Sequence, residues 1–147
     1  MRGRKGPSWS VDINAPRDKV FEYVLDFSRH PEWGMDDMVM KGLDGPAREG
    51  YMYEAEGTLR GKRNQSTVFV SDVQAPDSIE FEAQDRSGIV GHVFTFEPTN
   101  GSTRVTRTMY GIKQGALAPM LFVFFRGAIN KNFDGALQNL KRKMEQG

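Results

Sequence analysis

The stretch that decides the fold reads VDINAPRDKVFEYVLDFSRHPEW and runs from Val11 to Trp33. Apolar and polar residues alternate from Ser8 to Asn14, across the start of this stretch, and this alternation predicts a half-buried strand. Ala15-Pro16 ends this strand, and a proline suits the first turn of the helix that follows. The apolar face of that helix consists of Val20, Phe21, Val24 and Leu25. A second short helical turn is expected to begin at Pro31.

The middle of the chain, from Met38 to Ile112, has a mostly two-residue period, which is typical of strands. The strands expected there are Met38 to Leu43, Tyr51 to Gly61, Gln65 to Val73, Ser78 to Gln84, Ile89 to Glu97 and Thr103 to Gly111. The links between them are short and rich in turn-forming residues, as at Gly61 to Asn64 and at Asn100-Gly101. Such short links favour an antiparallel meander.

After Gly115 the apolar period becomes that of a helix. The stripe on its apolar face consists of Leu121, Phe125, Ile129, Phe133, Leu137, Leu140 and Met144. It predicts a helix of about 30 residues, roughly 45 Å long at the usual rise per residue. Such a helix needs a long apolar surface, which a strongly curved antiparallel sheet of about six to seven strands would supply. The predicted fold class is therefore α+β, in the order β-α-α-β(6)-α.

Composition and charge indicate a single domain over residues 1–147, with residues 1–7 expected to form a flexible tail. Of the 147 residues, 38% are hydrophobic and 27% are charged, and the net charge of +1 provides no overall attraction to nucleic acid. The chain has no cysteine and two histidines, so neither a disulfide nor a metal site is expected. No nucleotide or cofactor motif is found. No apolar signal segment follows the basic N-terminus, so a cytoplasmic location is expected.

The stretch from Val11 to Trp33 resembles the opening of the START-like, birch-pollen-allergen-like (SRPBCC) superfamily, and in particular its polyketide cyclase/dehydrase and lipid transport group. The shared features are an apolar strand, a small residue with a proline, Val-Phe on a helix, an aspartate, and Pro-x-Trp. Weaker matches lie at Glu49-Gly50, Val73 to Pro76 and Phe94 to Pro98. The resemblance implies a helix-grip fold, in which the sheet and the C-terminal helix enclose an apolar cavity. Ser102 stands where the group commonly has a glycine.

Alternation along the expected strands indicates which side chains face this cavity. Glu54 and Glu56 favour the solvent face of their strand, so the neighbouring tyrosines should point inward. By the same reasoning Phe81 points inward and Glu80 points to solvent. The expected ligand-binding residues are Tyr51, Tyr53, Phe81, His92, Phe94, Arg107, Met109, Met120, Leu121 and Phe124.

His92 and Arg107 are the two candidates for a catalytic role. An inward-facing His92 could act as an acid or base, or donate a hydrogen bond to a ligand, and it could equally be a satisfied core histidine. An inward-facing Arg107 needs a partner, which could be an anionic oxygen of a ligand or a carboxylate of the protein. Asp26 and Trp33 are expected to be structural, and His30 is expected at the surface.

Hypotheses from different functional classes remain open at this point. The first is the binding of a small hydrophobic molecule, such as a lipid, an isoprenoid or a polyketide. The second is an enzyme resembling the aromatic polyketide cyclases, which would promote aldol closure with His92 as acid or base and Arg107 or a tyrosine at an enolate. The third is a protein-interaction module of the co-chaperone type, with a filled core.

The apolar run from Leu117 to Phe125 could contact a membrane transiently, form a lid or lie in a dimer, so monomer and homodimer are both left open.

Overall fold

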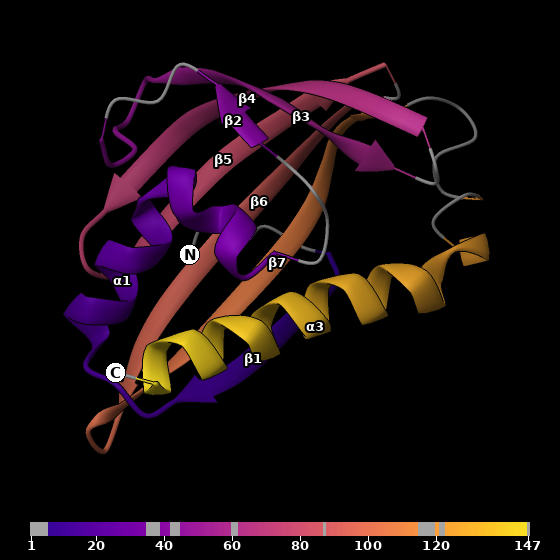
Figure 1. Cartoon of the computed structure of the whole chain (residues 1–147). Coiled ribbons are helices and arrows are strands. Elements are labelled where there is room, and N and C mark those ends of the chain that lie inside the picture. Colours follow the sequence, from indigo (N-terminus) through magenta and orange to yellow (C-terminus); the bar gives the residue numbers. More distant parts are fainter. Residues whose placement is uncertain are drawn as a thin grey trace.

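A computed structural model describes residues 6–34, 39–41, 45–59, 62–86, 88–114, 120 and 123–146. It shows a curved antiparallel sheet that curls around the C-terminal helix, with the N-terminal helices on the same concave face (Figure 1). The strands are β1 (Ser8–Ile13), β2 (Val39–Lys41), β3 (Met52–Leu59), β4 (Lys62–Gln74), β5 (Ser78–Asp85), β6 (Gly88–Thr99) and β7 (Ser102–Gln114). The helices are α1 (Arg17–Leu25), the 3-10 helix η1 (Phe27–Glu32) and α3 (Arg126–Glu145). The predicted α+β helix-grip class is confirmed.

The seven strands lie in the order β1-β7-β6-β5-β4-β3-β2. From β3 onward each strand pairs with the next one along the chain, as the short links predict. β1 instead crosses to the far edge of the sheet and pairs with β7, where Val11 lies opposite Val105. The register shifts once between Val70 and Asp72 and once between Ile89 and Val90. An extra residue at such a shift bends the strand, which helps the sheet to curve around the helix.

Several element boundaries differ from the sequence prediction, and three of the differences have a structural explanation. The second helix begins at Phe27 instead of Pro31, because the Asp26 carboxylate accepts hydrogen bonds from the backbone and hydroxyl of Ser28 and caps the 3-10 turn. β4 begins at Lys62 inside the expected hairpin turn, and Arg63 there forms an ion pair with Glu56 across the strands. The last helix, expected to have about 30 residues, has 20 in α3, because a turn at Phe125 precedes it.

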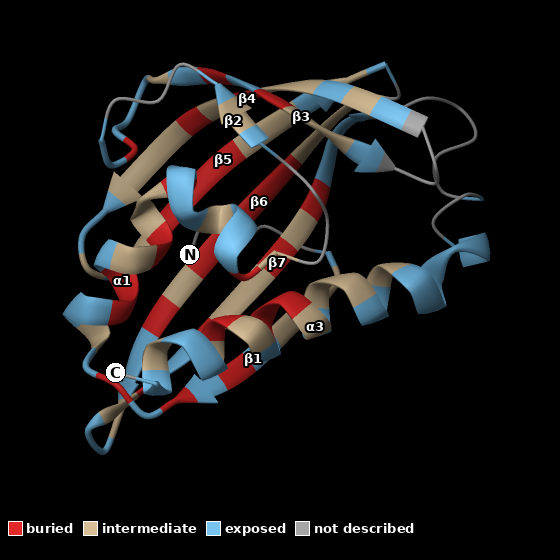
Figure 2. Ribbon diagram, in the orientation of Figure 1, coloured by how far each residue is buried: buried red, intermediate tan, exposed pale blue. Residues whose placement is uncertain are grey.

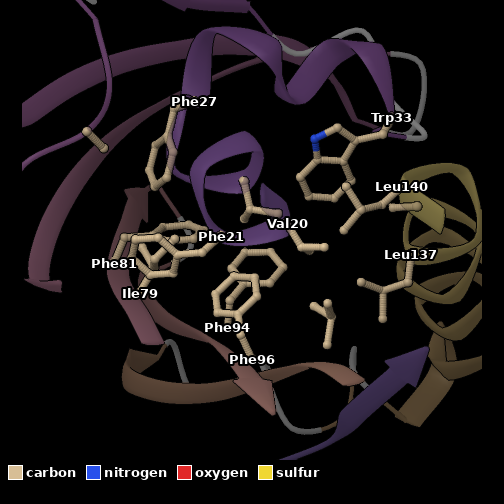
Figure 3. Close-up of a cluster of buried hydrophobic side chains, with 14 of the residues drawn as sticks. Val20, Phe21, Phe27, Trp33, Ile79, Phe81, Phe94, Phe96, Leu137 and Leu140 are labelled. Carbon is tan, nitrogen blue, oxygen red and sulfur yellow. The ribbon is translucent and has the colours of Figure 1, made fainter. Parts of the chain in front are cut away.

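The core fills the space between the concave face of the sheet, α1, η1 and the second half of α3 (Figure 3). Side chains from all of these elements meet around Val20 and Phe21 of α1. Trp33 is almost fully buried between η1 and α3, and its backbone carbonyl accepts a hydrogen bond from Asn139. The structural roles predicted for Asp26 and Trp33 agree with this arrangement.

The convex face of the sheet contains a buried polar contact that the alternation does not predict. Glu80 points to this outer face, as expected, but it is buried instead of exposed. The Tyr110 hydroxyl on β7 donates a hydrogen bond to the Glu80 carboxylate on β5. To reach it, the Tyr110 ring lies directly over Gly91 of the intervening strand β6. The expectation of a solvent-exposed Glu80 was therefore wrong, because a residue two strands away covers it.

Replacing Gly91 with alanine is expected to lower the free energy of unfolding by about 1–3 kcal/mol. A Cβ atom at Gly91 would lie 2.1 Å from the Tyr110 Cζ atom, so the ring and its bond to Glu80 must shift. Gly127→Ala is the matched control, since a Cβ at Gly127 meets nothing within 4 Å and its helix should gain up to about 1 kcal/mol. Urea unfolding of both variants measures the difference. Equal stabilities would show that Tyr110 does not lie over Gly91 in solution.

Candidate functional site

The concave face of the sheet is tightly packed toward one end and more accessible toward the other (Figure 2). At the packed end the inward-facing Ile79, Phe96 and Val105 and the α3 residues Leu137 and Leu140 are buried. Further along the same strands, and on the first half of α3, the inward-facing residues are only half-buried. These residues are Ala83 on β5, Val90 on β6, Met109 on β7 and Phe133 on α3, and together they define the open end of the concave face.

His92 and Arg107 meet at the boundary between the two ends. Phe94 lies opposite Arg107 and His92 opposite Met109, so His92 and Arg107 are diagonal neighbours on the inner face of β6 and β7. The Arg107 Nη2 atom donates a hydrogen bond of 3.1 Å to the His92 Nδ1 atom. The prediction that both residues face inward on adjacent strands agrees with this contact.

Aromatic rings hold this pair in place. The His92 ring is nearly parallel to the Phe81 ring, with 4.9 Å between their centroids. The Arg107 guanidinium lies 4.3 Å from the Phe133 centroid and 5.1 Å from the Phe94 centroid. Cation–π contacts of this kind favour the charged guanidinium in a partly desolvated place. Phe133 was absent from the expected ligand residues, although its position on the apolar helical stripe placed it on the sheet-facing side.

The hydrogen bond from Arg107 also fixes the protonation state of His92. A guanidinium has only donors, so Nδ1 must be the unprotonated acceptor and the ring proton is on Nε2. Burial, and then the charge of Arg107, lower the pKa of His92 well below its usual value, so the imidazole is neutral at pH 7. Among the described residues, no group accepts a hydrogen bond from Nε2. His92 thus offers one N–H donor, and the arrangement favours hydrogen bonding over proton abstraction.

His30 is not the surface residue that the sequence predicts. Its ring lies between Phe27, at 4.5 Å, and Trp33, at 4.9 Å between centroids, because the 3-10 helix turns it toward the core. The Nε2 atom donates to the Val24 carbonyl at 2.8 Å. Burial is the main cause that lowers the pKa of His30 to about 4.

The remaining expected ligand residues fall into separate groups. Tyr53, Phe81 and Phe94 are buried in the core, whereas Tyr51 and Met109 are half-buried. Met120 and Phe124 are exposed and precede the first turn of α3, because the turn at Phe125 interrupts the helical stripe. Leu121 lies outside the described residues.

One buried donor was missed by the sequence argument. The Trp33 indole N–H is buried and has no hydrogen-bond partner among the described residues. A polar group of this kind usually bonds to an ordered water or a ligand.

Among the described residues, no group of three His, Cys, Asp or Glu side chains is placed to hold a metal ion. No helix in the described part of the chain is long and apolar enough to cross a membrane.

Comparison with known proteins gives a family and a fold. A family model described as polyketide cyclase / dehydrase and lipid transport matches residues 8–145. A START superfamily protein from Mycobacterium smegmatis is similar in structure, with a TM-score of 0.73 and 18% identity over 95% of this chain and 97% of that one. A conserved protein from Geobacillus kaustophilus matches with a TM-score of 0.71 and 15% identity over 95% and 94% of the two chains. Ara h 8.0201 matches with a TM-score of 0.70 and 9% identity over 99% and 100%. A search of curated protein sequences finds no significant match.

Proposed function

Because the chain belongs to the polyketide cyclase/dehydrase and lipid transport family, we propose that it binds a small hydrophobic molecule at the open end of the concave face. The observation that supports the proposal is that the inward-facing side chains of the sheet and of α3 are less buried at this open end than at the packed end. Val90, Met109 and Phe133 are apolar and inward-facing, yet they are only half-buried. Burying such surface against a ligand is favourable by about 25 cal/mol per Å² of apolar area.

The polar groups beside this surface indicate how the ligand is oriented. Arg107 and the Nε2–H of His92 are both donors. A ligand that presents a carbonyl, carboxylate or hydroxyl oxygen to them would satisfy the imidazole N–H, while its apolar part covers Met109 and Phe133. A few fixed polar groups within a mainly apolar lining are typical of small-molecule sites.

The other hypotheses have less support. A cyclase-like reaction would benefit from the same donors, since they would stabilise an enolate oxygen. Such a reaction also needs a group that takes up a proton, and the tautomer of His92 makes its imidazole a donor. A protein-interaction module with a filled core does not account for the half-buried apolar residues of the inner face. Ligand binding is therefore the function that we propose.

The direct test is native mass spectrometry of freshly purified protein, followed by solvent extraction and identification of what is released. A stoichiometric hydrophobic molecule is the expected result, and it would also show the chemical class of the ligand. A protein that carries nothing and does not take up the dye 8-anilinonaphthalene-1-sulfonate would contradict the proposal.

Arg107→Met is expected to weaken the binding of this dye by about tenfold, because the dye carries a sulfonate and charge-assisted hydrogen bonds are among the strongest. Dye fluorescence measures the affinity, and circular dichroism verifies that the variant is folded. Arg104→Met is the matched control, since Arg104 lies on the opposite face of the same strand and pairs with Asp12. Equal affinities for the two variants would show that the ligand oxygens do not lie at Arg107.

A further inference from the structure

The beginning of the C-terminal helical region exposes a group of large apolar side chains. Phe124 is 82% exposed, Val123 is 66% exposed and Met120 is 64% exposed, and Phe125 next to them is 37% exposed. We call these four residues the apolar tip. Figure 2 shows the start of α3 exposed, at the end of the helix that extends beyond the strands. Exposed aromatic residues side by side in a folded protein mark a surface that meets a partner.

The charges around the apolar tip have one sign. Between Glu97 and Asp134 the sequence contains five basic residues and no acidic residue, although the whole chain has 20 basic and 19 acidic residues. Three of the five, Lys113, Arg126 and Lys131, are exposed at the end of β7 and in the first turns of α3. The apolar tip is therefore flanked by cations within a stretch of chain that carries no compensating carboxylate.

This charge pattern distinguishes between the partners that an apolar surface could have. In a symmetric dimer the same surface meets itself, so Arg126 and Lys131 of one copy would face the cations of the other. The nearest acidic residue in the sequence is Asp134, one helical turn after Lys131, so the excess of cations makes that contact unfavourable. An anionic lipid surface offers acyl chains to the phenylalanines and phosphates to the cations.

We propose that the apolar tip inserts into membranes that contain anionic lipids, with Arg126 and Lys131 at the headgroups. The proposal rests on the exposed tip and its charges, and does not require the proposed ligand site. The proposed ligand site lies beneath the first half of α3, so insertion of the apolar tip would place the open end of the concave face close to the membrane. A hydrophobic molecule could then pass between the bilayer and the protein with little exposure to water.

Flotation with vesicles tests the proposal. The full chain is mixed with vesicles of phosphatidylcholine alone, or of phosphatidylcholine with about 30% phosphatidylglycerol, so that only the surface charge differs. Binding is expected to the anionic vesicles, and it should weaken at high salt because counterions screen the headgroups. Phe124→Ser is expected to reduce partitioning about tenfold, since one exposed phenylalanine no longer inserts. Lys131→Glu is expected to reduce it as well.

Met52→Ser is the matched control, because Met52 is 66% exposed on β3, away from the apolar tip. Equal partitioning of Phe124→Ser and Met52→Ser would overturn the proposal, as would absence of wild-type binding. A dimer that Phe124→Ser dissociates in light-scattering chromatography, without any vesicle binding, would assign the tip to self-association and also overturn it. If the Phe124→Ser variant loses dye binding but still binds vesicles, Phe124 belongs to the ligand site instead, which also overturns the proposal. Loss of vesicle binding with dye binding unchanged is the result expected.

Discussion

Replacing Phe94 with alanine is expected to lower the free energy of unfolding by about 3–5 kcal/mol. The Phe94 ring is fully buried at the centre of the concave face. Its centroid lies 6.1 Å from the Trp33 ring, 6.2 Å from the Phe81 ring and 6.5 Å from the Phe96 ring. Truncation would remove contacts with rings from β5, β6 and the segment after η1, and leave a cavity that none of these elements can close alone.

Urea unfolding of Phe94→Ala and Phe124→Ala measures the effect of the same change in two surroundings. Phe124 is the matched control because its side chain is mostly in water, and its removal is expected to change the stability by less than about 0.5 kcal/mol. The experiment also decides whether Phe94 belongs to the core or to the ligand site. A loss below about 1 kcal/mol for Phe94→Ala would mean that its surroundings are loosely packed. The accessible part of the concave face would then extend past His92.

Local patterns were sufficient to predict much of this fold. Alternation over Ser8 to Asn14 correctly placed β1, and short turn-rich links correctly predicted an antiparallel meander. The inward orientation of Tyr53, Ile79 and Phe81 followed from the carboxylates beside them. Successive side chains in a strand point to opposite faces of the sheet. The direction of each side chain can therefore be inferred from the sequence up to the point where a bulge shifts the register.

Two of the features that could not be predicted depend on residues far apart in the sequence. Glu80 is buried because Tyr110, two strands away, reaches across Gly91, and no local pattern encodes this contact. The hydrogen bond between His92 and Arg107 depends on the diagonal register of β6 and β7. The inward turn of His30 is local instead, because its ring packs between Phe27 and Trp33 on a 3-10 helix capped by Asp26, and the sequence pattern did not predict that helix at Phe27.

The stability of the protein is expected to fall as the pH is lowered from about 6.5, before most carboxylates are protonated. The chain has two histidines, and both have a pKa below the value of about 6.5 for an unfolded chain. Below that pH the unfolded chain takes up protons that the folded protein does not, so acid favours unfolding. The two neutral imidazoles contribute fully to the free energy of unfolding above about pH 6.5. The contribution of His30 then decreases as the pH falls, until His30 is also protonated in the folded protein at about pH 4.

The expected slope is large for a small domain. Each histidine that titrates only in the unfolded state contributes about 1.4 kcal/mol per pH unit, so the two together approach about 2.7 kcal/mol per unit. The carboxylates of Asp12, Glu32 and Glu56 have pKa values lowered mainly by hydrogen bonds to basic side chains, so they add to the loss only at lower pH. Urea unfolding at intervals between pH 8 and pH 5 would show this early loss.

A variant with His30→Asn and His92→Gln separates the histidines from all other groups. Asparagine and glutamine can donate and accept hydrogen bonds but do not titrate, so the free energy of unfolding of this variant should be nearly independent of pH between 6.5 and 5. Nuclear magnetic resonance of the wild type tests the same point, because neither imidazole should titrate near pH 6.5 in the folded protein. A His92 ring that does titrate there would show that Arg107 does not hold His92 as a neutral donor. If both rings stay neutral, the His92 N–H remains a donor throughout this range, and the affinity for a neutral ligand should be the same at pH 8 as at pH 6.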